Sequence, residues 1–159
     1  MNSYNGFEPK QRYKALKWFR EQQRLGFRPI KPTKCDVCTQ TKGALEYHSE
    51  DYSDPFGANI GQFGLCYTCH MMIHCRYKSI NSWNVYKKAL EEKKVFKPFY
   101  SRNWIWFKKQ CLTEKFAFMD YELVKENNYK VLLEIEAGTY IPKKKVIKNK
   151  EEQLDIFSV

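Results

Sequence analysis

Two cysteine pairs constrain the fold of this chain more than any other feature of its sequence. Cys35 and Cys38 form one C-x2-C pair, and Cys66 and Cys69 form a second pair 28 residues later. Each pair fits a tight turn that aims both sulfurs inward, so two pairs can close a tetrahedral thiolate site. A redox-active C-x2-C pair is the competing interpretation, but a redox site consists of a single pair and does not account for the second. We therefore expect a structural Zn²⁺ on all four cysteines, whose binding adds about 10 kcal/mol to folding.

The histidines form a second cluster in the same part of the chain. All three of them, His48, His70 and His74, lie within residues 35–75. His70 follows the second cysteine pair directly, and His74 comes four residues later, which places both rings on one face of a helix. His48 lies on a candidate strand between the two pairs. Three imidazoles that converge from a strand and a helix predict a divalent metal site with open coordination positions.

Other interpretations of these residues stay open. The three histidines could be unrelated surface or core residues. His70 or His74 could replace a cysteine in a zinc site of three cysteines and one histidine, which would leave one cysteine without a metal. A nucleophilic pair of a cysteine and a histidine is a further alternative, although thiolates on zinc are poor free nucleophiles. Cys75 and Cys111 belong to neither pair, and we expect them to be small buried apolar residues.

The charge of the chain is unevenly distributed. The formal net charge is +10, with +7 in residues 1–34, −4 in 35–75, +8 in 76–115 and −1 in 116–159. Basic segments that flank an acidic centre favour a polyanionic partner, because each neutralised phosphate releases counterions. The acids in the centre suit metal chemistry better than phosphate contact. The alternative is that the lysines only keep the protein soluble.

Hydrophobic periodicity gives a coarse secondary structure. Residues 8–25 predict an amphipathic helix with Tyr13, Leu16, Phe19 and Gln23 on one side. The segment LEYH alternates like a short strand, the glycine-rich segment SDPFGANIGQFG predicts a loop, and a helix should begin at Cys66.

The second half of the chain is less regular. Residues 76–94 should continue helically with Ile80, Trp83 and Leu90 on one face. Residues 95–118 are rich in aromatic residues. Residues 119–136 predict either a helix or a helix followed by a strand at KVLLEIEA.

Together these patterns predict an α+β protein in four consecutive segments. Residues 1–34 form a basic helix and connector, 35–78 a zinc and metal module, 79–142 a helical, basic and aromatic-rich extension, and 143–159 a charged tail. No stretch approaches the 18 apolar residues of a membrane span, and the N-terminus lacks the apolar centre of a secretory signal. We therefore expect a cytoplasmic protein without a membrane partner.

Residues 35–75 resemble a known family. The stretches C-D-V-C, L-E-Y-H-S-E-D-Y and L-C-Y-T-C-H-M-M-I-H look like the zinc-ribbon-supported motif of HNH (His-Me finger) endonucleases. The resemblance covers about a quarter of the chain. It implies a small ββα-metal core stapled by a four-cysteine zinc site and surrounded by helices. It also implies a hydrolase that cleaves phosphodiester bonds in DNA with Mg²⁺, Mn²⁺ or Zn²⁺ as the catalytic ion.

The resemblance also suggests roles for single residues. His48 resembles the strand ligand of the catalytic ion, His70 and His74 resemble the helix ligands, and Asn59 resembles the loop residue that orients the general base. Many relatives have two adjacent histidines on the strand, whereas this chain has His48 followed by Ser49.

Two alignments of this strand disagree by one residue. If His48 takes the ligand position, Ser49 falls on the base position, and Glu50, Asp51 or a metal-bound water has to act as the base. If His48 is the base instead, Tyr47 takes the ligand position. Solvation in a loop is the alternative role for Glu50 and Asp51.

The remaining residues of such a nuclease would have to hold the DNA duplex. Trp104, Trp106 and Phe107 either stack on exposed bases or pack in the core. The candidates for phosphate contact are Arg76, Lys78, Lys87, Lys88, Arg102, Lys108 and Lys109.

Two other functions compete with the nuclease. One is a zinc-stabilised protein that binds DNA without cleaving it, and the Ser49 departure favours it. The other is a protein-interaction module in which zinc is purely structural. The sequence leaves the oligomeric state open, a homodimer being one candidate.

Overall fold

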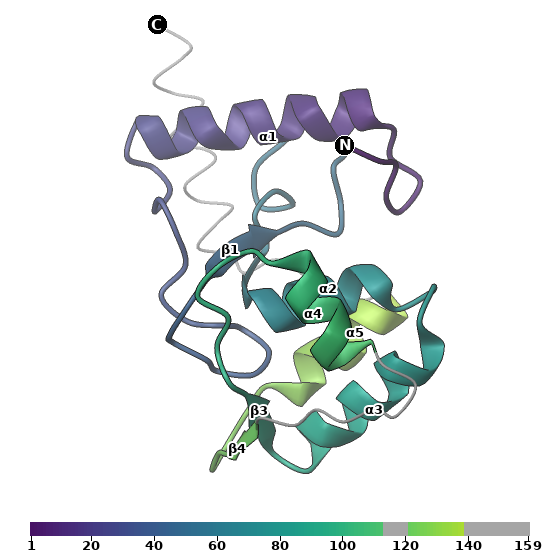
Figure 1. The fold of residues 1–159 in the computed structure, drawn as a ribbon. Coiled ribbons are helices and arrows are strands. Elements are labelled where there is room, and N and C mark those ends of the chain that lie inside the picture. Colours follow the sequence, from purple (N-terminus) through teal and green to yellow (C-terminus); the bar gives the residue numbers. More distant parts are fainter. Residues whose placement is uncertain (113–120, 139–159) are drawn as a thin grey trace, which may run out of the picture. The chain divides into compact units, whose positions relative to one another are not determined.

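The structure is a computed structural model that describes residues 1–112 and 121–138 (Figure 1). The elements of these residues are α1 (Pro9–Arg24), β1 (Leu45–His48), β2 (Phe63–Cys66), α2 (Tyr67–Cys75), α3 (Ile80–Glu91), β3 (Lys94–Phe96), α4 (Trp104–Cys111), β4 (Tyr121–Leu123) and α5 (Tyr129–Ala137). The strands pair into two small antiparallel sheets, β1 with β2 and β3 with β4. This mixture of helices and small sheets confirms the α+β class. Among the described helices, none combines the length and the apolar character that crossing a membrane requires.

The described residues form two compact units that interleave along the sequence. The first consists of residues 1–31 and 47–63, and the second of residues 32–46, 64–112 and 121–138. The sequence analysis divides the chain into four consecutive segments by charge and composition. These properties do not show where the chain leaves one compact unit and later returns to it. The expected charged tail, residues 143–159, lies outside the described residues, as do the aromatic residues Phe116 and Phe118.

In the first unit, α1 covers almost the whole of the expected helix. Pro9 begins it at a position where a missing backbone N–H costs nothing, and Gly26 follows it with a φ of 81°. The buried residues of α1 are Ala15, Phe19 and Gln22. Ala15 and Phe19 form a small core with Ile60, which lies in the loop between β1 and β2. The predicted face was wrong by part of a turn, because Tyr13 is 60% exposed and Ala15 is buried in its place.

A short hairpin precedes α1. Tyr4 and Phe7 pair across it, with backbone hydrogen bonds of 3.1 and 2.9 Å between them. Asn5 and Gly6 at its tip have φ angles of 49° and 80°. Positive φ at both central residues is typical of the Asn-Gly turns that join strands closely. The hairpin carries two polar side chains, those of Tyr4 and Asn5, that contact the candidate site described below.

In the second unit, α3 is the central helix. It contacts α2, β3 and α5 (Figure 1). Its buried face includes Trp83, Tyr86 and Leu90. Strands β3 and β4 are antiparallel, with Val95 opposite Glu122. The core of this unit therefore lies around α3, beside the helix that carries two of the three histidines.

Three sequence expectations for this unit were wrong. The helix does not continue through residues 76–79, because α2 ends at Cys75 and α3 begins at Ile80. Ile80, expected on the buried face, is 59% exposed, whereas Tyr86 is fully buried. The segment KVLLEIEA, a candidate strand, belongs to α5, and a strand precedes that helix rather than following it.

Candidate metal centres

The first cysteine pair is attached to β2 through Asp36. The Asp36 backbone N–H donates to the Gly64 carbonyl over 2.7 Å, and the Gly64 N–H donates to the Asp36 carboxylate over 2.7 Å. The approach is so close that a Cβ on Gly64 would lie 2.5 Å from a side-chain carbon of Pro32. Only glycine fits there without a shift of the backbone. This contact folds the chain back and brings the end of β2, Cys66, to the first pair.

The second pair spans the start of α2. Cys66 is the N-cap of the helix, and its sulfur accepts a hydrogen bond from the Cys69 N–H over 3.5 Å. In the first pair the Cys35 sulfur accepts in the same way from the Cys38 N–H, again over 3.5 Å. All four residues are buried free thiols, and their sulfurs lie within 4.8 Å of one another. The structure therefore brings the four predicted cysteines together with their sulfurs facing inward.

The electrostatics of this cluster call for a cation. Burial raises the pKa of the Cys69 thiol well above its ordinary value, and the neighbouring thiols raise it further. Hydrogen bonds with Cys35 and Cys38 raise the pKa of Cys66. Burial opposes ionisation of Cys35 as well, but hydrogen bonds from the other three thiols outweigh burial and lower its pKa. Four buried thiolates this close together would repel one another, so they require a positive charge between them.

The spacing of the sulfurs fits such an ion. Sulfurs about 2.3 Å from a tetrahedral zinc lie about 3.8 Å apart. The Cys38 and Cys66 sulfurs are 3.6 Å apart. The four-cysteine group could therefore bind a metal ion such as zinc.

A buried tyrosine lies close enough to the cluster to be influenced by its charge. Tyr86 of α3 is fully buried, and within the described residues its hydroxyl has no hydrogen-bond partner. Burial raises the pKa of this phenol well above its ordinary value, and the four cysteines raise it further. A buried hydroxyl without a partner is costly, so Tyr86 lowers the stability of this core.

The other two cysteines belong to neither group of potential ligands among the described residues. Cys111 is buried, and burial raises its pKa to about 12. Burial also raises the pKa of Cys75, which is half-buried. Both therefore stay protonated at neutral pH and are poor ligands or nucleophiles.

Two of the histidines face each other on α2. The Nε2 atoms of His70 and His74 lie 3.1 Å apart, as the spacing of four residues predicted. The Nδ1 atom of His70 lies 2.8 Å from a carboxylate oxygen of Glu46. Arg102 in turn forms an ion pair with the other carboxylate oxygen of Glu46. A carboxylate that accepts the proton of Nδ1 fixes the tautomer in which Nε2 presents a lone pair.

The third histidine has a carboxylate partner of its own. His48 is buried, and its Nε2 atom lies 2.6 Å from an oxygen of Glu50. Tyr4 donates a hydrogen bond to the same oxygen over 2.6 Å, and Asn5 donates to the other oxygen over 2.6 Å. The hairpin before α1 therefore holds Glu50 against the imidazole.

The three histidines also form a candidate ligand group. One ligand atom from each of His48, His70 and His74 lies within 4.8 Å of the other two. Imidazole nitrogens suit zinc and other first-row divalent ions. These residues could therefore hold a second metal ion, separate from the four cysteines.

Ser49 and the two predicted catalytic residues Asp51 and Asn59 make local contacts. The Ser49 hydroxyl accepts a hydrogen bond from the Gly61 N–H over 2.8 Å. Asp51 accepts from the Ser53 N–H over 2.8 Å, and Asn59 donates to the Ser53 carbonyl over 2.6 Å. These bonds shape the loop between β1 and β2. Among the predicted catalytic residues, Glu50 is therefore the one that contacts a histidine directly.

The predicted phosphate-contact residues differ in exposure. Arg76 is 4% exposed, and its guanidinium donates to the Ile73 carbonyl over 3.0 Å, so this residue is a poor candidate for contact with DNA. Lys87 forms an ion pair of 2.9 Å with Glu136, and Arg102 is exposed although it pairs with Glu46. The candidates left on the surface are Lys78, Lys88, Lys108 and Lys109.

The aromatic residues of α4 divide in the same way. Phe107 is fully buried, which agrees with core packing. Trp104 and Trp106 are about half exposed, although Trp104 stacks on Phe107 with ring centroids 5.6 Å apart. The surface of α4 therefore combines exposed indoles with exposed lysines.

No protein-family model, no curated protein and no solved structure matches this chain. The resemblance to HNH nucleases therefore depends on the sequence of residues 35–75 alone.

Sequence reasoning missed four residues in the surroundings of the two clusters. They are Tyr4, Asn5, Glu46 and Tyr86. A signal existed for Glu46, because alternate residues of a strand share a face, and Glu46 and His48 are alternate residues of β1. Nothing in the sequence marks the other three residues.

Proposed function

We propose that this protein is a metal-dependent DNA endonuclease of the HNH type. A zinc site on the four cysteines would stabilise the fold, and a second divalent ion, Mg²⁺, Mn²⁺ or Zn²⁺, would be held by His48, His70 and His74. The observation that carries the proposal is the pair of facing imidazoles on α2, 3.1 Å apart, with Glu46 behind His70. Nitrogens about 2.05 Å from one ion lie about 2.9 Å apart in octahedral and about 3.3 Å apart in tetrahedral geometry.

The side chains around the second group have distinct tasks. Glu46 orients His70, and Arg102 neutralises the charge of that carboxylate. Glu50 orients His48, whether His48 binds the ion or accepts a proton from water. When bound, the ion supplies Lewis-acid neutralisation of the charge that develops on the scissile phosphate.

The surface charge supports DNA as the substrate. The net charge of +10 is concentrated in the segments before and after the metal module. Lys78, Lys88, Lys108 and Lys109 are exposed and can approach a phosphate backbone. Double-stranded DNA has a higher density of phosphate charge along its axis than a single strand. It therefore attracts a distributed positive charge more strongly, without base-specific contacts.

One observation favours a second function. Ser49 stands where one alignment places the general base, and its hydroxyl holds the Gly61 N–H of the loop. A serine committed to that contact is a poor base. This favours a zinc-stabilised protein that binds DNA without cleaving it.

A plasmid assay separates these functions. Supercoiled DNA is incubated with the protein and Mg²⁺, Mn²⁺ or Zn²⁺, and nicking is compared among wild type, His74→Ala and Tyr77→Ala. Tyr77 is exposed and lies just beyond α2, so its variant controls for damage to this region. Nicking that His74→Ala abolishes and Tyr77→Ala retains supports the nuclease. Tight binding without nicking under all three ions supports the second function. Failure to bind DNA at low salt points to a protein-interaction module with purely structural zinc.

A further inference from the structure

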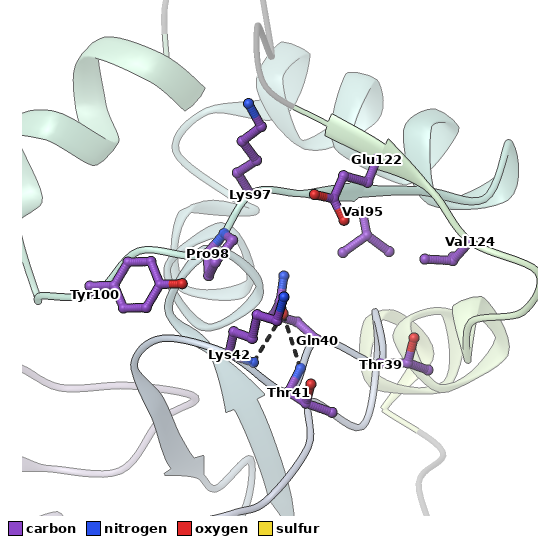
Figure 2. Close-up of a pocket in the computed structure, with 10 residues that line it drawn as sticks. All are labelled: Thr39, Gln40, Thr41, Lys42, Val95, Lys97, Pro98, Tyr100, Glu122 and Val124. Atoms are coloured by element: carbon purple, nitrogen blue, oxygen red, sulfur yellow. Dashed lines mark hydrogen bonds between the residues drawn. The ribbon is translucent and has the colours of Figure 1, made fainter.

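The second unit contains a cavity that neither metal group uses. It has a volume of about 450 Å³ and lies between the turn after Cys38 and the sheet of β3 and β4 (Figure 2). This volume lies within the range of pockets that bind small molecules. The cavity is therefore large enough for a single nucleotide unit.

The walls of this cavity are well fixed. The Gln40 side-chain oxygen accepts from the backbone N–H groups of Thr41 and Lys42 over 3.1 and 3.0 Å, and its amide donates to the Phe96 carbonyl over 3.3 Å. On the other wall, the antiparallel pairing of Val95 with Glu122 sets the backbone position of Glu122, whose side chain is exposed. Backbone contacts on both walls mean that the cavity can be preorganised for a ligand.

The polar groups of the cavity are complementary. Figure 2 shows the ends of Lys42 and Gln40 on one side and the carboxylate of Glu122 on the other, with Val95 beside that carboxylate; Lys42 and Glu122 are both exposed. Within residues 1–112 and 121–138, neither Lys42 nor Glu122 takes part in an ion pair. The cavity thus offers a cationic donor opposite an anionic acceptor above an apolar floor. Its ligand should present N–H donors to the carboxylate and oxygen or nitrogen acceptors to the ammonium.

We propose that this cavity binds the base of a guanine nucleotide. The N1–H and N2–H₂ groups of guanine can donate two parallel hydrogen bonds to the Glu122 carboxylate, while O6 and N7 accept from the Lys42 ammonium. Tyr100 is 77% exposed at the mouth of the cavity and offers a ring face for stacking. Lys97, exposed at the rim, provides a positive charge near the phosphate. The inference deepens the proposed function, on which it rests, because the guanine would be an unpaired nucleotide of the DNA substrate.

Nucleotide binding tests the proposal directly. The full zinc-loaded chain, labelled with ¹⁵N, is titrated with dGMP, dAMP, dCMP and dTMP at low salt without further divalent ions. We expect dGMP to bind about tenfold or more tightly than dAMP, with shifts at Thr41, Lys42 and Glu122. Glu122→Gln should lower dGMP affinity about tenfold, and Glu91→Gln, which removes the same charge from an exposed site of α3 outside the cavity, should not. Equal affinities for the four nucleotides, or equal effects of the two variants, would overturn the proposal.

A second arm identifies the source of the base. Anisotropy measurements compare a duplex with one bulged guanine, the same duplex with a bulged thymine and the fully paired duplex. A preference for bulged guanine that Glu122→Gln removes supports a nucleotide of the DNA strand. Selectivity for dGMP without that preference supports the guanine cavity with a free nucleotide as its occupant. Guanine selectivity in a protein that never nicks DNA overturns the nuclease alone, and nicking without guanine selectivity overturns the cavity proposal alone.

Discussion

Glu46→Gln is the most informative single change in this protein. The carboxylate lies 2.8 Å from Nδ1 of His70, and its other oxygen pairs with Arg102. Glutamine keeps the size of the side chain but removes the charge that fixes the tautomer of His70. If His70 binds an ion through Nε2, this change should weaken binding without removing any ligand.

The magnitude follows from the role of such a carboxylate. Loss of the group that orients a metal-binding histidine typically lowers affinity about 10- to 100-fold, or about 1.4 to 2.7 kcal/mol. Arg102 is exposed and regains water when its partner is neutralised, so its contribution to the loss should be small. Co²⁺ titration followed by absorption gives the affinity, and the spectrum separates thiolate from imidazole coordination. Wild type should bind two ions per chain, and Glu46→Gln should weaken only the one on imidazole.

The control is Glu91→Gln, which removes one acid from the exposed surface of α3. It should bind both ions as wild type does. Two results together would refute the role of Glu46. The imidazole site of Glu46→Gln would bind Co²⁺ within about twofold of the wild-type affinity, and His74→Ala would lose binding at that site. A protein that binds one ion in total, on thiolates, would refute the second site altogether.

Three further predictions concern the cysteines and Tyr86. Tyr86→Phe should raise the free energy of unfolding by about 1 kcal/mol in denaturant titrations, because the variant removes a buried hydroxyl that has no hydrogen-bond partner among the described residues, and a loss of stability would contradict this. Zinc content, followed with a chromophoric chelator, should fall as the pH is lowered, because protons compete for the four thiolates; constant content from about pH 7 to about pH 4 would argue against zinc on these cysteines. The pKa of Cys111 is raised from 9.0 to about 12 by burial, so its thiol stabilises the fold fully below pH 9 and loses this contribution as the pH rises towards 12. Cys111→Ala should therefore flatten the alkaline decline of unfolding free energy, by up to about 1.4 kcal/mol per pH unit, in denaturant titrations; an equally steep decline in both proteins would contradict it.

The sequence predicted those features that short-range chemistry dictates. Two C-x2-C turns have few other uses than closing a thiolate site, and the four cysteines do come together. The spacing of His70 and His74 fixes their relative position once a helix forms. The start of α2 was predictable for the same reason, since the helix begins directly after Cys66.

Features that depend on tertiary packing were predicted less well. The face of α1 was misjudged because Ile60, far away in the sequence, selects Ala15 and Phe19 rather than Tyr13. The break between α2 and α3 carries no proline or glycine. There the Lys78 and Ser79 N–H groups donate to the Cys75 carbonyl, over 3.0 and 2.9 Å, which ends one helix without a sequence signal.

Contacts over long sequence distances were the least predictable. Tyr4 and Asn5 bind Glu50 across more than 40 residues, and Asn59, expected beside a histidine, binds the carbonyl of Ser53 instead. Only the fold determines which of several nearby polar groups an amide or hydroxyl will contact.

Cys66 has two tasks that cannot be separated. Its sulfur belongs to the thiolate cluster, and the same sulfur caps the helix whose first and second turns carry His70 and His74. Occupancy of the cysteines would thus order the helix on which the imidazoles depend, so filling one centre would raise the affinity of the other. Thermodynamic reciprocity requires the same gain in the opposite direction. Metal supply would then act as a cooperative control, in which a chain short of zinc loses its second ion as well.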